Sequence, residues 1–281
     1  MIFQRVNSYK YYQDFVDALR STFFKLNLIL DGEPAIYLSD PVWRDCALSI
    51  WDKDHDGYIT KVEADVSYML NVAALQNTDL IQVLDLSKLA TKGLYNFYAS
   101  NLPNLREIYF GKIDTGVPVL PYQGFMNNIS LELLDMGDYA QETNRMLCKG
   151  ATNLKKVVVS KSLTKVDAQA FMNCTSLAEI SDIPDSCTGI YGDYNNEVFR
   201  NCTSMKSITV GRGMQRIGWG TFRDCTAMES FYIKATTPPT LDGDVFTNNP
   251  CTIYVPIGCG TAYKTATNWS TYASRIQEYN F

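Results

Sequence analysis

Short runs of apolar residues recur along most of this chain in one frame. The frame reads apolar–x–x–apolar–x–apolar, and its alternating second half suits a strand that is buried on one face. The leading apolar residues of the copies are Ile81, Leu105, Leu131, Leu154, Leu177, Met205 and Met228. Spacings of 24, 26, 23, 23, 28 and 23 residues separate these positions. Self-similarity at such a period predicts a solenoid, because one repeat cannot bury its own apolar face and stacked repeats share a core.

The fifth copy departs from the frame. Asp182 stands where an apolar residue is due, and Ile183 follows it. The same copy opens the longest spacing, which contains the sequence YGDYNNE at residues 191–197. We expect this insertion to bulge on the convex face or at an edge, either as a plain loop or as a contact for a partner.

One phrase is repeated three times within the array. It reads FMNCTSL at residues 171–177, FRNCTSM at 199–205 and FRDCTAM at 222–228. We predict that its Phe fills the layer behind each strand, and that Cys174, Cys202 and Cys225, joined by Cys148, form a second inward column. Free cysteine behaves as a small buried hydrophobe, so reduced thiols are expected there. Cys251 and Cys259 are the one pair for which a disulfide stays open.

A unit of 23 to 28 residues in this frame is typical of a leucine-rich repeat. We therefore predict a repeat solenoid of the α/β class, in which a leucine-rich repeat array builds a parallel β-sheet. The predicted divisions are an N-terminal helical cap at 1–76, about seven repeats at 77–250, and a C-terminal cap at 251–281. The C-terminal cap is expected to hold a last strand at 252–255 and one or two short helices, with Trp269, Tyr272 and Ile276 facing one way.

The sequence motifs of the repeats resemble those of the BspA-type leucine-rich repeat proteins of Bacteroidetes and related anaerobes. Besides the phrase itself, the resemblance includes IPDS at 183–186, RIGWGTF at 216–222, TTPPT at 236–240 and IYVPIGCGTAYKTATNW at 253–269. It covers residues 78–281 and is specific for the fold rather than for a ligand. It implies an adhesin-like protein of the cell surface, or a secreted one, that binds a protein or glycan, including extracellular host molecules.

A different motif precedes the repeats. Residues 52–63, DKDHDGYITKVE, match the EF-hand loop at every ligand position. The candidate calcium ligands are Asp52, Asp54, Asp56, Tyr58 through its carbonyl, Thr60 through water, and Glu63. Gly57 allows the sharp turn, because glycine tolerates positive φ. Oxygen-only ligation by a flexible loop favours Ca²⁺ over Mg²⁺.

Helices are predicted on both sides of this loop. Ser39, Asp40 and Pro41 form a start signal for a helix at 42–51, and a second helix is expected at 64–75. An amphipathic helix at 8–30 is expected to pack on the first repeat. Because a sensor usually pairs two loops, we expect one structural calcium site that fixes the helical cap against the array. The alternative is an acidic, solvated turn between two helices.

The composition limits the remaining function classes. A net charge of −5 gives no electrostatic footprint for nucleic acid. No transmembrane helix is apparent, and residues 1–30 show no signal peptide, so a cytoplasmic location also stays open. His55 is the only histidine and occupies a non-ligand position of the acidic loop, which excludes histidine-dependent catalytic triads. We therefore expect no enzyme activity.

The middle position of each strand frame is predicted to point outward from a concave face. The candidate partner-binding residues are Asp85, Tyr109, Asp135, Val158, Thr209 and Tyr232. Tyrosine is enriched at protein interfaces, whereas β-forming residues also suit an ordinary sheet surface. Two functions follow: an adhesin-like surface module, or a structural or assembly protein that works inside the cell or in the envelope without a host ligand.

Overall fold

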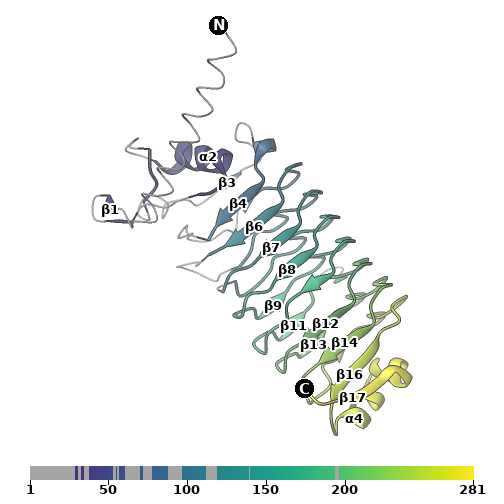
Figure 1. Cartoon of the computed structure of the whole chain (residues 1–281). Coiled ribbons are helices and arrows are strands. Elements are labelled where there is room, and N and C mark those ends of the chain that lie inside the picture. The colour runs from purple at the N-terminus through teal and green to yellow at the C-terminus, as the bar shows by residue number, and fades with distance from the viewer. Residues whose placement is uncertain are drawn as a thin grey trace.

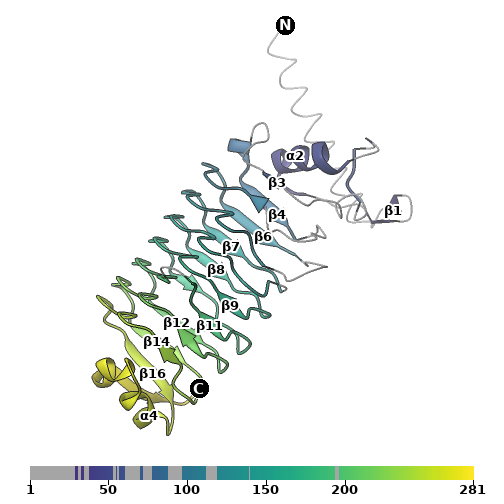
Figure 2. The ribbon, with the colours of Figure 1, turned by 180° about the vertical axis from the view of Figure 1, so that it is seen from behind.

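The computed structural model describes residues 29–30, 33–34, 38–52, 55, 57–60, 70–71, 78–87, 97–111, 119–138, 140–193 and 196–281. They build an elongated stack of short strands, with α2 near one end and α4 at the other (Figure 1). The view from behind shows the same order of layers (Figure 2). Most of the predicted helix at 8–30 lies outside the described residues. Its last two residues, Ile29–Leu30, form strand β1 and pair with β2 (Glu33–Pro34), so the helix prediction is wrong there.

One strand from each repeat joins a long parallel sheet, here called the main sheet. Its first part contains β4 (Val83–Leu86), β6 (Glu107–Phe110), β7 (Leu133–Asp135), β8 (Lys156–Val158) and β10 (Glu179–Ile180). Its second part contains β12 (Ser207–Val210), β14 (Ser230–Ile233), β16 (Thr252–Pro256) and β17 (Ile276–Tyr279). All neighbours pair in parallel, as a solenoid requires. The predicted repeat solenoid is confirmed.

The two parts of the main sheet meet at the imperfect fifth repeat. Ile183, and not Asp182, bridges to Val210 and is buried, while Asp182 is exposed. Asp182 is therefore an extra residue between β10 and the buried Ile183, as in a β-bulge.

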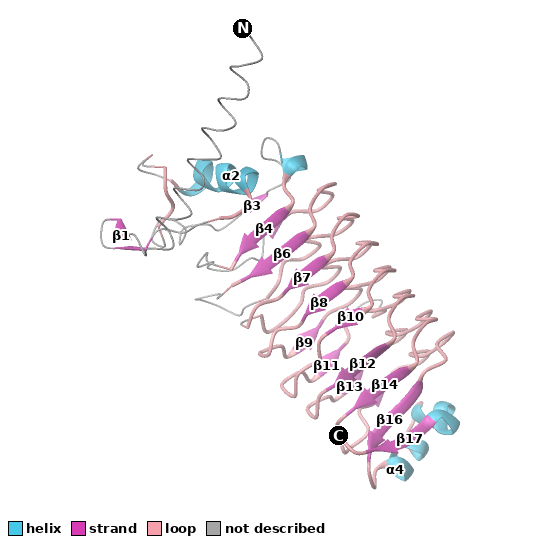
Figure 3. Cartoon of the chain, viewed as in Figure 1, coloured by secondary structure: helices cyan, strands magenta, loops and turns pink. Residues whose placement is uncertain are grey.

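A second parallel sheet, which the sequence frame did not predict, forms on another side of each repeat (Figure 3). It contains β9 (Lys165–Val166), β11 (Gly189–Ile190), β13 (Arg216–Ile217) and β15 (Thr240–Leu241). Bridges from Lys165 to Glu142 and from Glu142 to Val119 extend the same ladder toward the N-terminus. The four repeats that begin at Leu154, Leu177, Met205 and Met228 thus contribute one short strand to each sheet.

The phenylalanines of the repeated phrase form one buried column. The Phe171 and Phe199 rings stack at 5.3 Å, and the Phe199 and Phe222 rings stack at 5.6 Å. Phe246 continues the stack beyond Phe222 at 5.6 Å. These rings are fully or almost fully buried, so the prediction of matching inward places in successive layers is confirmed.

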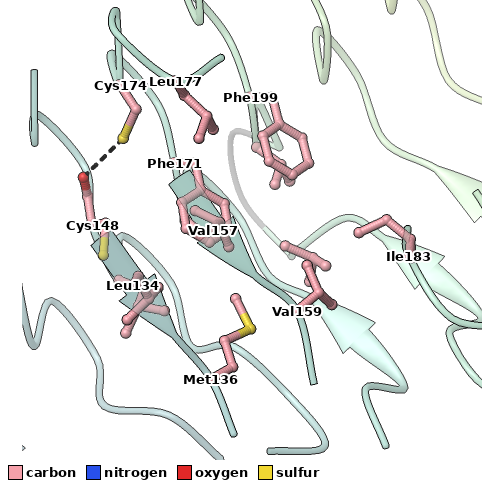
Figure 4. Close-up of a cluster of buried hydrophobic side chains, with 14 of the residues drawn as sticks. Leu134, Met136, Cys148, Val157, Val159, Phe171, Cys174, Leu177, Ile183 and Phe199 are labelled. Atoms are coloured by element: carbon pink, nitrogen blue, oxygen red, sulfur yellow. Dashed lines mark hydrogen bonds between the residues drawn. The ribbon is translucent and has the colours of Figure 1, made fainter. Parts of the chain in front are cut away.

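A second column also exists, but its membership differs from the prediction. The Sγ of Cys202 donates to the carbonyl of Phe171 at 3.3 Å, and that of Cys225 to the carbonyl of Phe199 at 3.1 Å. In the preceding layer the Sγ of Cys174 donates to the carbonyl of Cys148 at 3.3 Å (Figure 4). Cys148 therefore takes the place of a phenylalanine, and its assignment to the cysteine column is wrong. All eight cysteines are free thiols, Cys251 and Cys259 included.

The cysteine column begins and ends with other residues. Asn128 and Asn249 follow left-handed residues in the same way as the cysteines do. The Asn249 amide donates to the Phe222 carbonyl at 3.0 Å, as a cysteine does one layer earlier. Asn128 donates to the Ala99 carbonyl at 2.8 Å. Both side chains are buried, and each donates to a backbone carbonyl of the core.

Left-handed backbone at two positions, four residues apart, shapes the corner of each repeat. The pairs are Gln123 with Asn127, Met146 with Gly150, Gln169 with Asn173, Glu197 with Asn201, Gly220 with Asp224, and Asp244 with Asn248. Asn, Asp and Gly adopt this conformation most easily, which explains the residue before each cysteine in the phrase.

The N-terminal cap is clamped to the first strand of the main sheet. Helix α2 (Pro41–Trp51) begins after Asp40, as predicted. One oxygen of the Asp40 carboxylate accepts from the N–H groups of Val42 and Trp43 at 2.9 Å. The other oxygen accepts from Gln82 and Val83 at 2.9 Å, so one buried carboxylate joins the helix to the edge of β4.

The helix predicted at 64–75 is wrong at Leu70–Asn71. These residues form β3, which pairs in parallel with β5 (Phe97–Tyr98). Backbone pairing with a distant segment has overridden the local preference of the sequence. Residues 64–69 and 72–75, the rest of that helix prediction, lie outside the described part of the chain. A short 3₁₀ helix, η2 (Thr78–Leu80), leads into β4.

The C-terminal cap closes the last layers with aromatic side chains. It contains α4 (Gly260–Thr265) and the 3₁₀ helix η3 (Trp269–Arg275). Trp269 and Ile276 are buried and Tyr272 packs against the core, as predicted. The Trp269 indole donates to the Pro239 carbonyl at 2.8 Å. Strand β17, which was not predicted, follows η3 and lies at the edge of the main sheet.

Candidate interaction surface and calcium-binding loop

The six predicted contact residues lie in two aligned rows on the main sheet. In the first row Asp85 is paired with Tyr109, Tyr109 with Asp135, and Asp135 with Val158. In the second row Thr209 is paired with Tyr232. All six side chains are partly exposed and lie between buried neighbours on their strands. The structure therefore brings them onto one face, and their role in partner binding stays a prediction.

The second row is longer than predicted. Tyr232 is paired with Tyr254, and Tyr254 with Gln277. The signal for Tyr254 was present in the sequence, because it lies between the apolar residues Ile253 and Val255. Gln277 gave no comparable signal, since only the first residue of β17 is buried.

The bulge at Asp182 separates the two rows. Ser181 accepts a hydrogen bond from the N–H of Val159 at 2.8 Å, so its hydroxyl fills a place in the backbone ladder. Asp182 forms an ion pair with Lys234 at 3.1 Å, across the intervening strand β12. The face consequently has an N-terminal part on β4–β8 and a C-terminal part on β12–β17.

The N-terminal part is acidic around one tyrosine. The Tyr109 hydroxyl donates to Oε2 of Glu107 at 2.7 Å. Burial, the hydrogen bond to Glu107 and the nearby carboxylates raise the pKa of Tyr109 to about 12. Asp85 and Asp135 each accept from a backbone N–H two residues later, at 2.9 Å in both cases. These turns fix both carboxylates at the ends of their strands.

The C-terminal part is aromatic. The rings of Tyr232 and Tyr254 stack at 4.8 Å, and Tyr279 contacts both edge-on at 5.2 and 5.5 Å. Phe281 lies 5.1 Å from Tyr279. Tyr279 and Phe281 are 43% and 41% exposed, which makes this the aromatic end of the face.

The insertion at 191–197 is folded back onto the second sheet in its described residues. The Tyr191 ring lies 4.6 Å from the Arg216 guanidinium and 5.1 Å from the Lys165 ammonium. Gly189 leaves room for it, because a Cβ there would come within 2.2 Å of the ring. Glu197 is buried and pairs with Arg200. These contacts explain the insertion as packing, and its role in partner contact stays a prediction.

The acidic loop is described at Asp52, His55 and residues 57–60. Asp52 caps the C-terminus of α2. Its Oδ2 accepts from the Gly57 N–H at 3.0 Å, and Gly57 has φ of +86°. Ile59 is buried, as the motif requires. This hydrogen bond joins Gly57, at position 6 of the loop, to Asp52, which is the predicted first ligand.

The structure describes only two of the five remaining candidate calcium ligands. Tyr58 and Thr60 are described and partly exposed, whereas Asp54, Asp56 and Glu63 lie outside the described residues. In the described part of the chain no three His, Cys, Asp or Glu side chains gather as a metal site, and three of the proposed ligands fall outside that search. Asp52 and Gly57 fit a calcium loop, and metal binding itself stays a prediction.

The buried thiols offer no nucleophile. Burial raises the pKa of Cys187 to about 11 and that of Cys225 to about 12, and it raises the pKa of Cys202 well above its usual value. A reactive cysteine needs the opposite shift, because the thiolate is the nucleophile. None of the helices in the described residues has the length and apolarity needed to span a bilayer.

The repeats match a known family model. Residues 118–253 match the model of the BspA type Leucine rich repeat region in six copies. No curated protein matches the chain.

Three solved structures are similar to the chain. A T. pallidum leucine-rich repeat protein (TpLRR) is 23% identical, with a TM-score of 0.40, over 44% of this chain and 57% of that one. The pneumococcal vaccine antigen PcpA is 16% identical, with a TM-score of 0.37, over 71% of this chain and 55% of that one. A leucine-rich repeat protein from Bacteroides ovatus is 15% identical, with a TM-score of 0.27, over 72% and 76%. The chain spans little more than half the length of the first two.

Proposed function

Because residues 118–253 match the model of the BspA type Leucine rich repeat region, we propose that this chain is a non-enzymatic protein-interaction module that binds through the main-sheet face. Leucine-rich repeat proteins are generally protein-interaction modules, and BspA-type ones are often associated with the cell surface. The finer proposal is an adhesin-like role there, with a protein or glycan ligand that includes extracellular host molecules. The observation that supports it most is the alignment of Asp85, Tyr109 and Asp135, and of Thr209 and Tyr232, in two rows.

The composition of these rows suits contact with a partner. Tyrosine gives a large contact area at a low cost in side-chain entropy. The rows contain Tyr109, Tyr232 and Tyr254 at half-exposed positions on a rigid sheet. A rigid platform favours binding, because little ordering is needed when the partner arrives.

A binding screen against extracellular-matrix proteins and glycans tests this proposal. The wild type is compared with Tyr109→Ser/Tyr232→Ser, which removes one tyrosine from each row. The control Tyr122→Ser changes an exposed tyrosine outside both rows. We expect a ligand that the row variant loses and the control keeps. Equal binding by all three proteins, or binding by none, contradicts the surface proposal and favours a structural or assembly role without a host ligand.

We also propose that residues 52–63 bind one structural Ca²⁺ ion. The supporting observation is the hydrogen bond from the Gly57 N–H to the Asp52 carboxylate, with Gly57 at positive φ. The predicted ligands are Asp52, Asp54, Asp56, the Tyr58 carbonyl, Thr60 through water, and Glu63. The proposal rests on the loop and not on a pair of flanking helices, since Leu70–Asn71 is a strand.

The position of the loop suggests what the ion would stabilise. Asp52 ends the same helix whose start, at Asp40, is bonded to the edge of β4. The Trp43 indole also donates to the Asp85 carbonyl at 3.1 Å. An ion that orders the C-terminal end of α2 therefore supports the first strand of the interaction surface.

Thermal unfolding with and without Ca²⁺ tests the site. A ligand that binds only the folded state stabilises it by about 2.7 kcal/mol at a hundredfold excess over its Kd. We expect Ca²⁺ to raise the Tm of the wild type and to leave that of Asp52→Ala/Glu63→Ala unchanged. Mg²⁺ at the same concentration should have a smaller effect. A wild type that does not respond to Ca²⁺ contradicts the calcium proposal and favours a solvated acidic turn.

A further inference from the structure

Three carboxylates lie close together around Tyr109 at the N-terminal end of the main-sheet face. Within the described residues Asp85, Glu107 and Asp135 form no ion pair. Other acids on neighbouring turns of the array are paired: Glu132 with Arg106 and Lys155, Glu179 with Lys156, Asp138 with Lys161, and Asp182 with Lys234. Asp85, Glu107 and Asp135 therefore gather three carboxylates without an ion pair around Tyr109 on one part of the face.

The geometry of the strands sets the spacing of these groups. Asp85, Tyr109 and Asp135 occupy the same level of three successive strands, with the tyrosine in the middle. Adjacent strands lie about 4.8 Å apart, so the backbones that carry the two aspartates are separated by about 10 Å. Calcium binds oxygen at about 2.3–2.6 Å, so two oxygens on one ion lie at most about 5 Å apart. The aspartates are thus poorly placed to share a metal ion.

The tyrosine between them is held in place. Its hydroxyl donates to Glu107 on the same strand, and its ring is partly buried. The pKa of Tyr109 is raised, mostly by burial of the hydroxyl. Glu107, Asp135 and Asp85 raise this pKa further, so all three carboxylates act on the phenol. The hydroxyl consequently stays neutral at physiological pH. A neutral aromatic ring flanked by carboxylates is suited to a cationic side chain, because the ring face and the acids both attract positive charge.

We propose that Asp85, Glu107, Tyr109 and Asp135, the acidic face, dock a basic polypeptide segment of the protein partner. An Arg or Lys side chain lies over the Tyr109 ring, and neighbouring cations reach Asp85 and Asp135. This inference rests on the proposed function, since it states the chemistry of the segment that the module binds.

Charge complementarity selects this occupant over others. Phosphates of nucleic acids and anionic lipids are repelled by these three carboxylates, and a neutral glycan gains no ionic contact from them. An extended peptide rises about 3.3 Å per residue, so cations three residues apart match a separation of about 10 Å. The aromatic end on β12–β17 then remains for apolar parts of the same partner.

The test uses a labelled peptide with the repeated sequence Arg-Ala-Ala and a peptide in which Glu replaces each Arg. Fluorescence anisotropy gives the Kd for the full chain at low salt and at physiological salt. We expect the Arg peptide to bind, the Glu peptide not to bind, and salt to weaken binding because the contacts are exposed. Asp85→Asn/Asp135→Asn should weaken binding about tenfold, which is the loss expected from two ion pairs in a charged surface.

A second double variant controls for net charge. Glu179→Gln/Asp138→Asn removes the same number of charges from acids that are already paired, and it should leave the Kd within about twofold. Tyr109→Phe should keep binding because the ring remains, whereas Tyr109→Ser should lose it. Circular dichroism confirms that each variant is folded.

The outcomes separate this inference from the proposed function. Equal weakening by both double variants, or no binding of the Arg peptide, overturns the acidic-face proposal. If the matrix ligand is still lost in Tyr109→Ser/Tyr232→Ser, the interaction module survives that failure. If the matrix ligand is also unaffected by that variant, both proposals fall.

Discussion

Replacing Phe199 with alanine removes the central ring of the stacked column. Phe199 is fully buried and stacks on Phe171 at 5.3 Å and on Phe222 at 5.6 Å. A buried Phe→Ala change costs about 3–5 kcal/mol, and each lost aromatic pair is worth about 0.5–1.5 kcal/mol. With two stacked partners, we expect a loss near the upper end, about 4–5 kcal/mol. A domain has only about 5–15 kcal/mol in total, so this one change should bring the array close to unfolding.

The loss should spread to the neighbouring layers. In a repeat array each unit is stabilised by the interfaces on its two sides. Urea unfolding followed by circular dichroism measures the free energy, and hydrogen exchange with mass spectrometry locates the loss of protection. We expect protection to fall in the layers of Phe171 and Phe222 as well. Tyr122→Ala, at an exposed tyrosine, is the control and should cost less than about 1 kcal/mol.

Two results would refute this reasoning. A loss below about 1.5 kcal/mol for Phe199→Ala would mean that the stack contributes less than ordinary burial does. Unchanged protection in the layers on either side would mean that the repeats are not coupled through this column.

Three further predictions concern the second column and the N-terminal cap. Burial raises the pKa of Cys202 far above the value of about 8.5 in an unfolded chain, so the stability linked to this thiol is complete below pH 8.5 and falls as the pH rises toward the folded pKa. Cys202→Ser cannot ionise and should therefore lessen the decline in unfolding free energy above pH 8.5 by about 1.4 kcal/mol per pH unit. An identical decline in the variant and the wild type contradicts this. Asn249→Ala removes the 3.0 Å bond to the Phe222 carbonyl and the oxygen that accepts from the Cys251 N–H at 3.0 Å. It should cost about 2–3 kcal/mol in urea unfolding because a buried N–H loses its acceptor, and a cost near zero contradicts this role of the amide. Asp40→Ala removes the carboxylate that joins α2 to β4 and should cost about 3 kcal/mol with faster hydrogen exchange in β4, and unchanged exchange there contradicts the clamp.

The main sheet could be predicted from the sequence because its signal is local and repeated. Each strand has an apolar residue at every second position, and the burial of Ile208 and Val210 with Thr209 partly exposed follows that pattern directly. The outward row could be predicted for the same reason. The bulge was visible as Asp182 in an apolar place, and the structure shows Ile183 as the residue that replaces it.

The second sheet and the columns depended on information that the frame does not contain. Strands such as Gly189–Ile190 have two residues each, too few for periodicity, and pairing with distant repeats makes them strands. Cys148 was placed by its residue type, whereas its position after left-handed Met146 puts it in line with the phenylalanines. Counting from the left-handed residues would also have identified Asn128 and Asn249.

The two caps lack the sequence repeat from which the strands of the array were predicted. Strand β17 (Ile276–Tyr279) has a single buried residue, so its sequence resembles an exposed tail. Leu70–Asn71 lies in a stretch with helical character and is a strand through pairing with Phe97–Tyr98. In both cases a contact with a distant part of the chain decides the conformation.

The central claim is that partners bind on the outward face of the main sheet. The most direct measurement places the photo-crosslinking residue p-benzoylphenylalanine at Tyr109 or Tyr232, with Tyr191 on the second sheet as the control, and adds the ligand identified in the binding screen. We predict that the ligand is cross-linked from positions 109 and 232 and not from position 191. Cross-linking from position 191 alone would contradict the claim, because it would locate the partner on the second sheet.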